Sequence, residues 1–127
     1  AVARCTRARL VTAAHDCSDG GLGVALAEMA FAGGFGLDID ADRVPRAAGV
    51  TRLDQLLFAE SNSRIVLTVP SDRLAEARKL LADVPHEFVG DVIAERELRI
   101  RGCGRTVAAD LDALRDAWRG GLDAVAR

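Results

Sequence analysis

The chain has 127 residues, of which 50% are apolar and 28% are charged, a composition that fits one domain with a substantial core. Its formal net charge of −2, without a basic face, argues against nucleic acid as a partner. No apolar run has the length of a membrane span, and the arginine-rich start lacks a signal-peptide core, so we expect a soluble cytoplasmic protein without a membrane partner. Three widely separated cysteines argue against a disulfide framework and a structural zinc site.

The spacing of apolar residues predicts helices and strands along the whole chain. In chain order we expect a helix at 2–10, an apolar run at 11–14, a helix at 20–34, a strand at 36–40, an irregular stretch at 41–49, a helix at 52–58, a strand at 64–69, a helix at 72–82, strands at 86–93, 98–101 and 105–107, and a last helix from 111 onward. The strand at 64–69 has apolar residues on both faces, which predicts a central position in a sheet. Ser71 is expected to cap the helix that follows it.

The end of the chain predicts a hairpin followed by a docked helix. Gly102 and Gly104 indicate a hairpin turn, and the last three strands are expected to be antiparallel. Asp110 is expected to cap the last helix. The apolar stripe of that helix consists of Leu111, Leu114, Trp118 and Leu122. We expect Trp118 to dock the helix on the sheet, so that truncation to alanine costs about 3–5 kcal/mol. The order of elements predicts an α+β fold, one domain at 1–127 with a mixed, largely antiparallel sheet covered by helices.

A turn rich in acids and glycines precedes the second helix and reads His15-Asp16-Cys17-Ser18-Asp19-Gly20-Gly21-Leu22. Helix N-termini present unpaired N–H groups that suit phosphate, and glycines leave that backbone open to a ligand. Ser18, Asp19, Gly20 and Gly21 are therefore candidate nucleotide-binding residues, and we expect Gly21→Asp to abolish ligand binding while the fold survives. Asp16 and Asp19 fit either local caps or ligands of a metal ion or of substrate hydroxyls. A capped helix start explains the same turn without any ligand.

Two reactive side chains in this turn have simpler interpretations. His15 offers acid–base chemistry, but a partly buried histidine that bonds to backbone at a strand end is the favoured interpretation. A catalytic thiolate at Cys17 would gain from the helix N-terminus, but Asp16 and Asp19 oppose it, so a half-buried apolar filler fits better. We therefore assign no catalytic residue to this chain.

A second polar segment lies just before the strand at 64–69. Glu60, Ser61 and Asn62 combine acceptors and donors that suit the hydroxyls or amides of a ligand. A plain helix-to-strand loop is the alternative, because loops are often polar. These residues are candidates for substrate or nucleotide binding.

Both segments together resemble a known enzyme family. The acidic turn, followed by Ala25-Leu26-Ala27-Glu28, is similar to the HDxSDGGL motif and the next helix of phosphoribosylformylglycinamidine synthase. Residues 57–64, which read Leu-Phe-Ala-Glu-Ser-Asn-Ser-Arg, are similar to its LFxES(N/Q)xR segment, and residues 89–92 are similar to its IGxV strand. Order and spacing agree over residues 5–120.

The resemblance implies a place in a larger enzyme. The superfamily, which includes aminoimidazole ribonucleotide synthetase, joins an N-terminal ATP-binding domain to a C-terminal α+β domain, and this chain resembles the second of these. It is then a fragment of a longer chain, and its natural-looking end favours the last domain, in the second copy of a duplicated enzyme. The implied partners are the N-terminal ATP-binding domain and a glutaminase domain or subunit.

The resemblance also implies the chemistry. The family is an ATP-dependent ligase of purine biosynthesis that turns formylglycinamide ribonucleotide and glutamine-derived ammonia into formylglycinamidine ribonucleotide, with ATP and Mg²⁺ as cofactors. This domain would form one wall of the cleft for the phosphorylated ribonucleotide, with Glu60, Ser61 and Asn62 against the substrate and Asp16 and Asp19 acting through Mg²⁺. The isolated fragment is expected to be inactive.

Two alternatives remain open at this point. One is another superfamily member of the thiamin-phosphate kinase or selenophosphate synthetase type, which shares the turn but not the second segment. The other is a free-standing domain that binds a metabolite without catalysis, although the uncapped start at Ala1 does not favour it.

Overall fold

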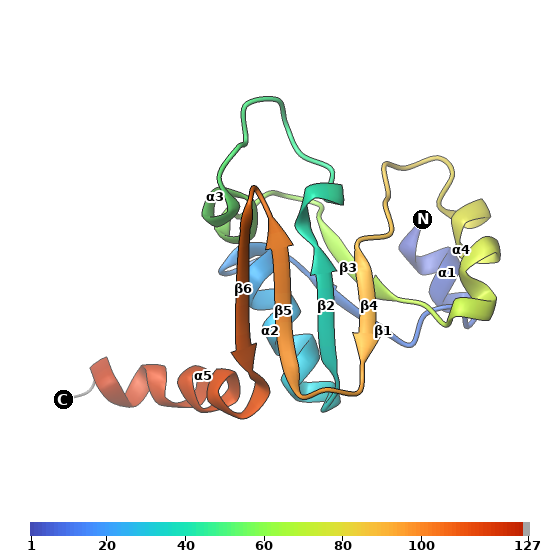
Figure 1. Ribbon diagram of the computed structural model, residues 1–127. Helices are drawn as coiled ribbons and strands as arrows, with labels where there is room; N and C mark the ends of the chain where they lie inside the picture. Colours follow the sequence, from blue (N-terminus) through green and yellow to red (C-terminus); the bar gives the residue numbers. More distant parts are fainter. Residues whose placement is uncertain (126–127) are drawn as a thin grey trace.

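The computed structural model describes residues 1–125, with side chains described as far as residue 121. In chain order the elements are α1 (Val2–Arg7), β1 (Ala13–Asp16), α2 (Gly21–Gly33), β2 (Gly36–Asp40), the 3-10 turn η1 (Ala41–Arg43), α3 (Leu53–Phe58), β3 (Ile65–Thr68), the 3-10 turn η2 (Ser71–Arg73), α4 (Leu74–Leu80), β4 (Gly90–Ile93), β5 (Glu97–Gly102), β6 (Arg105–Asp110) and α5 (Leu111–Val125). Helices and strands are mixed along the chain, which confirms the α+β class (Figure 1).

Four strands form a mixed sheet in the order β4-β2-β5-β6. β2 runs parallel to β5, and the β2–β4 and β5–β6 pairs are antiparallel. In the parallel pair Leu37 is opposite Leu98 and Ile39 is opposite Ile100, and all four side chains are buried. One face of the sheet is therefore an apolar layer that needs a cover.

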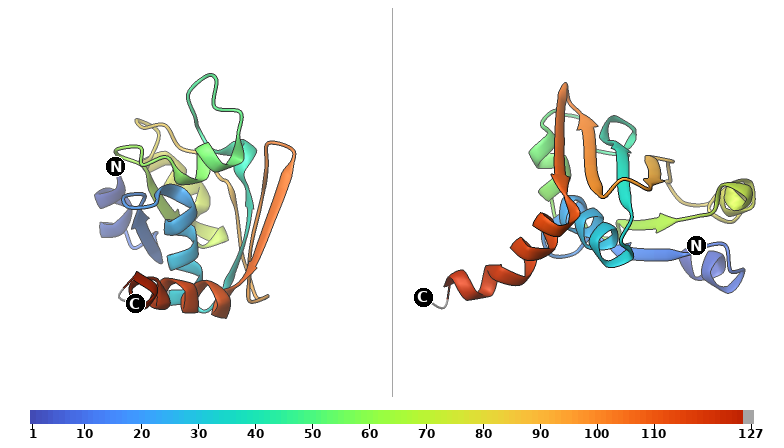
Figure 2. Two further views of the ribbon diagram at one scale, coloured as in Figure 1. Left: turned by 90° about the vertical axis from the view of Figure 1, so that its left-hand side faces the viewer. Right: turned by 60° about the horizontal axis from the view of Figure 1, so that its bottom comes forward.

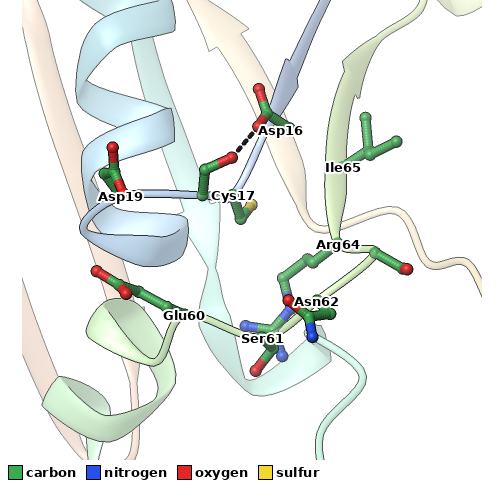
Figure 3. A pocket seen from close by; sticks show the side chains of 10 residues that line it. Asp16, Cys17, Asp19, Glu60, Ser61, Asn62, Arg64 and Ile65 are labelled. Carbon is green, nitrogen blue, oxygen red and sulfur yellow. Dashed lines mark hydrogen bonds between the residues drawn. The ribbon is translucent and has the colours of Figure 1, made fainter.

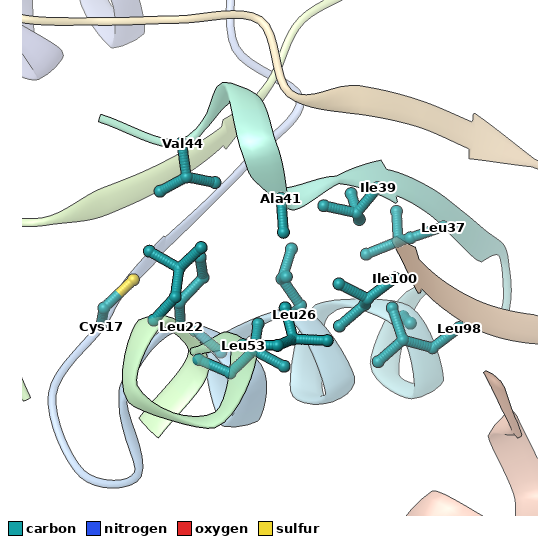
Figure 4. Close-up of a cluster of buried hydrophobic side chains, with 14 of the residues drawn as sticks. Cys17, Leu22, Leu26, Leu37, Ile39, Ala41, Val44, Leu53, Leu98 and Ile100 are labelled. Atoms are coloured by element: carbon teal, nitrogen blue, oxygen red, sulfur yellow. The ribbon is translucent and has the colours of Figure 1, made fainter. Parts of the chain in front are cut away.

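Helix α2 supplies that cover. Its buried Leu22 and Leu26 join the inner strand residues and Leu53 of α3 in one hydrophobic cluster (Figure 4). Because burying a leucine stabilises the fold by about 1.5–3 kcal/mol, this cluster fixes α2 firmly against the sheet. The start of α2, which carries the acidic turn, is thereby held in place.

β1 and β3 form a separate two-stranded ribbon, with α2 between it and the four-stranded sheet (Figure 2). The prediction of one sheet with β3 at its centre was wrong. Val66 packs against the core, but Ile65 on the other face is 45% exposed, so apolar residues on both faces do not mark a central strand here. The periodicity of one strand cannot identify its pairing partner, which is a nonlocal property.

Three local predictions need correction or confirmation. The helix after Pro70 begins at Leu74 behind a 3-10 turn and has no side-chain cap, so Ser71 is not its cap. Only Gly90–Ile93 of the strand expected at 86–93 is extended, and it pairs with β2, which lies between it and β5. Asp110 does cap α5: its Oδ1 accepts the backbone N–H groups of Asp112 and Ala113 at 2.9 and 3.0 Å.

Trp118 does not dock α5 on the sheet. Its ring lies 5.7 Å from that of Phe31 on α2, and its side chain is 58% exposed. α5 enters the core at its start through the buried Leu111, whereas Trp118 further along lies at the surface of α2, so the expected cost of 3–5 kcal/mol for its truncation is too high. Leu122 of the predicted stripe lies outside the described side chains. Within residues 1–125, no helix has the length and apolar character needed to cross a membrane.

Candidate functional site

The pairing of β1 with β3 brings the two candidate segments together. In this antiparallel ladder Asp16 is opposite Ile65, and the N–H of Cys17 donates to the carbonyl of Arg64 at 2.9 Å. The turn that follows β1 therefore lies beside the segment that precedes β3. They border an open hollow of about 390 Å³, which we call the acidic hollow (Figure 3). Its lining consists of Asp16, Cys17, Ser18, Asp19, Glu60, Ser61, Asn62, Ser63, Arg64 and Ile65.

The backbone N–H groups of the two glycines already have protein acceptors. The N–H of Gly20 donates to Oε1 of Glu60 at 2.9 Å, and that of Gly21 donates to the carbonyl of Ser18 at 3.2 Å. Because both N–H groups are hydrogen-bonded within the protein, the structure does not support their interpretation as open contacts for phosphate. Glu60 instead connects the two segments, and its carboxylate sits where the positive end of α2 favours an anion.

Gly21 is needed for packing. Its φ of +68° is left-handed, and a Cβ atom there would lie 2.8 Å from the carbonyl oxygens of both Leu57 and Ala59. The residue is buried and does not line the hollow. The expectation that Gly21→Asp leaves the fold intact is therefore wrong, because the side chain has no room among backbone atoms.

The hollow carries a negative charge. Asp16, Asp19 and Glu60 line it together with one arginine, Arg64. The hydroxyl of Ser18 donates to Asp16 and lowers the pKa of that carboxyl. The guanidinium of Arg64 faces the carbonyl oxygens of Leu56 and Pro45, at 3.4 and 3.5 Å. Such a site favours hydroxyls, amines or a cation-bound phosphate over a bare anion.

The donor set suits Mg²⁺ only in part. Carboxylate oxygens of Asp16 and Asp19 line the same hollow and are the hard ligands that Mg²⁺ takes. Among the described residues, no three His, Cys, Asp or Glu side chains gather closely enough to hold a metal ion. Mg²⁺ is commonly held by one or two carboxylates together with phosphate and water oxygens. Asp16 and Asp19 therefore fit a site in which a phosphate of the ligand and water supply the remaining oxygens.

Cys17 behaves as an apolar residue. It is 4% exposed and belongs to the hydrophobic cluster. Burial raises the pKa of its thiol, so the thiolate is disfavoured, in agreement with the interpretation as a filler.

His15 has a more specific environment than the sequence indicates. Its Nδ1 lies 2.6 Å from the carbonyl oxygen of Asp16, which confirms the expected backbone bond, and its Nε2 lies 2.7 Å from Oε2 of Glu28. A carbonyl and a carboxylate both accept, so this arrangement favours the protonated ring, in which both nitrogens donate. The bond to Asp16 is the main cause of the raised His15 pKa; burial opposes it and Glu28 reinforces it.

Glu28 is the residue that sequence reasoning missed. In the sequence it is one residue of the helix after the turn, yet its second oxygen, Oε1, accepts the indole N–H of Trp118 at 2.8 Å. The single available signal was its position on α2, thirteen residues after His15. That spacing does not predict a contact, because whether the two side chains meet depends on how α2 packs against β1.

Comparison with known proteins gives consistent matches. The profile of the family described as AIR synthase related protein, C-terminal domain, matches residues 1–103. The chain is 38% identical over 114 residues to phosphoribosylformylglycinamidine synthase subunit PurL of Deinococcus radiodurans. It is 49% identical over 118 residues to the subunit of the same name from Moorella thermoacetica. Both alignments cover 88% of this chain and 15% of the relative, so the chain spans about 15% of the length of the curated relatives it matches.

Solved structures match as well. PurL of Thermotoga maritima complexed with ATP superimposes with a TM-score of 0.72 at 29% identity, over 87% of this chain and 20% of that chain. The same protein complexed with FGAR superimposes with a TM-score of 0.72 at 28% identity, over 87% of this chain and 19% of that chain.

Proposed function

The chain belongs to the AIR synthase related proteins as a C-terminal domain of that family, and we propose that it works within phosphoribosylformylglycinamidine synthase. This cytoplasmic ligase of purine biosynthesis combines formylglycinamide ribonucleotide, glutamine-derived ammonia and ATP, and releases formylglycinamidine ribonucleotide, ADP and phosphate. The domain forms one wall of a nucleotide cleft and does not turn over substrate by itself.

The acidic hollow is the observation that carries this proposal. It unites the two segments that resemble the synthase, although they are separated by about forty residues of chain. The ATP and FGAR complexes of the Thermotoga protein support a nucleotide or phosphorylated ribonucleotide as its ligand. A free-standing metabolite-binding domain has no comparable support.

The residues that line the hollow have different roles in binding. Ser18, Ser61 and Asn62 offer hydroxyl and amide groups to the ligand, and Asp19 and Glu60 accept from its hydroxyls. In this proposal Glu60 exchanges the N–H of Gly20 for a ligand group when the cleft is filled. Gly21 contributes by allowing α2 to start close to the chain after α3.

Asp16 and Asp19 are the residues proposed to hold Mg²⁺ next to the ligand. The ion, when bound, neutralises the negative charge of phosphate oxygens. The two carboxylates bring the negative potential that attracts the ion, and the hydroxyl of Ser18 donates to the Asp16 carboxylate.

The remaining parts of the enzyme complete the site. The opposite wall comes from the N-terminal ATP-binding domain, and ammonia comes from a glutaminase domain or subunit. The resemblance implies a duplicated enzyme with a working half and an auxiliary half, and the auxiliary half binds nucleotide more than it takes part in turnover.

The proposal is tested by nucleotide binding to the full-length enzyme. Ser61→Ala and Asn62→Ala should weaken binding of ATP or of the ribonucleotide in calorimetry, and Ser71→Ala, an exposed serine of η2, is the matched control. A rise in substrate KM would place the hollow in the working half, and a change in nucleotide affinity at constant KM would place it in the auxiliary half. Unchanged affinity for both ligands in both variants would overturn the proposal.

A further inference from the structure

A continuous chain of hydrogen bonds runs from the acidic hollow to the C-terminal helix. His15 on β1 contacts the main-chain carbonyl of Asp16 with one ring nitrogen and the carboxylate of Glu28 with the other, at 2.6 and 2.7 Å. Glu28 on α2 also accepts the indole N–H of Trp118 on α5, at 2.8 Å. One carboxylate thus joins the consecutive elements β1 and α2 to α5, which lies ninety residues further along the chain.

The chain ends at a residue of the hollow. Asp16 is the last residue of β1, and its carboxylate lines the hollow, while its main-chain carbonyl is the group that His15 holds. Beyond this point the strand becomes the acidic turn. The direction of the Asp16 side chain therefore depends on a peptide group that His15 fixes.

Core packing does not explain this arrangement. The side chains of His15 and Glu28 are 31% and 28% exposed, and the hydrophobic cluster that holds α2 against the sheet includes neither. A glutamate on α2 that made neither of these hydrogen bonds would be equally compatible with the helix. Both oxygens of Glu28 are instead committed to specific donors, which restricts its rotamers and those of His15.

We infer that Glu28 is a positioning residue for the hollow: it fixes His15, and through His15 the Asp16 end of β1, while Trp118 fixes Glu28. This inference rests on the proposed function, because its expected effect is on the Mg²⁺-dependent binding of ATP. Glu28 touches no ligand in this scheme. Removal of the Glu28 carboxylate lowers the affinity of a correctly folded site for ATP and Mg²⁺.

The test uses the full-length enzyme without ribonucleotide or ammonia, so that ATP binds without turnover. Calorimetry measures the Mg²⁺ concentration that gives half-maximal ATP binding. For Glu28→Ala we expect that concentration to rise about 10-fold, the usual effect of removing a group that orients a metal ligand. Glu28→Gln should largely restore it, because an amide can still accept from Trp118 and donate to a neutral His15. The matched control is Glu76→Ala, an exposed glutamate of α4.

The outcomes are distinct. Absence of Mg²⁺-dependent ATP binding by the wild-type enzyme would refute the proposed function itself. Normal wild-type binding with an unchanged Mg²⁺ requirement in Glu28→Ala would overturn the inference. If Glu28→Ala lowers the Tm strongly, Trp118→Phe decides, because it keeps the ring next to Phe31 and removes only the N–H that Glu28 accepts. A two- to three-fold rise supports the inference in that case, and no rise rejects it.

Discussion

Oε1 of Glu60 accepts the backbone N–H of Gly20 at 2.9 Å, across forty residues of chain. This bond closes the acidic hollow at the start of α2 and satisfies one N–H group that a helix start leaves unpaired. The acceptor that caps α2 thus comes from the segment before β3, since no side chain of the turn caps Gly20.

Removing that acceptor should loosen the start of α2. We expect Glu60→Ala to lower the free energy of unfolding by about 1 kcal/mol, the usual contribution of a capping side chain. Glu60→Gln should keep most of the stability, because its amide oxygen still accepts from Gly20. Urea denaturation of both variants measures the difference, and equal stability of Glu60→Ala and the wild type would show that the bond is not formed in solution.

Gly21→Ala should be strongly destabilising. The left-handed φ of +68° costs about 1–2 kcal/mol for a residue with a Cβ atom, and the clash with the carbonyl oxygens of Leu57 and Ala59 adds to it. Gly104→Ala is the matched control, because Gly104 has a φ of +69° and open space around its Cβ position. Thermal denaturation should show a larger fall in Tm for Gly21→Ala, and equal falls would mean that the chain after α3 moves away freely.

The residues of the candidate site were predictable from the sequence, but their arrangement was not. Composition and spacing mark Asp16, Asp19 and Glu60 as polar groups in turns, where ligands are commonly bound. That these turns meet follows from the pairing of β1 with β3, which depends on the whole fold. Periodicity placed the helix at 20–34 and the strand at 36–40 to within about a residue of α2 and β2, because those patterns are local.

The errors share a physical cause. A glycine in a turn has the same appearance in sequence whether its open side faces a ligand or, as at Gly21, another stretch of backbone. A tryptophan in an apolar stripe has the same appearance whether it is buried or, as at Trp118, lies across a neighbouring helix with its N–H bonded to a carboxylate. Only tertiary contacts distinguish these cases.

Stability should depend on pH through His15. Its pKa is raised in the folded chain, chiefly by its bond to the Asp16 carbonyl, so folding favours the protonated ring. This contribution is complete below the ordinary histidine pKa of about 6.5 and is lost as pH rises through the higher pKa of the folded state. Denaturation at a series of pH values should show a decline over that window that His15→Gln lacks. His86→Gln, at the chain's other histidine, should keep the decline; its loss in that variant as well would assign the effect elsewhere.

Trp118 should contribute less to stability than a buried tryptophan does. Its side chain is 58% exposed, and its contacts with α2 are the ring of Phe31 and the carboxylate of Glu28. We expect Trp118→Ala to cost about 1–2 kcal/mol, in contrast to the 3–5 kcal/mol of a core aromatic residue. Trp118→Phe separates the two contacts, because it retains the aromatic pair and removes the hydrogen bond, and it should cost about 0.5–1.5 kcal/mol. Chemical denaturation of the two variants measures both values, and a loss above 3 kcal/mol in Trp118→Ala would show that Trp118 is packed as a core residue in solution.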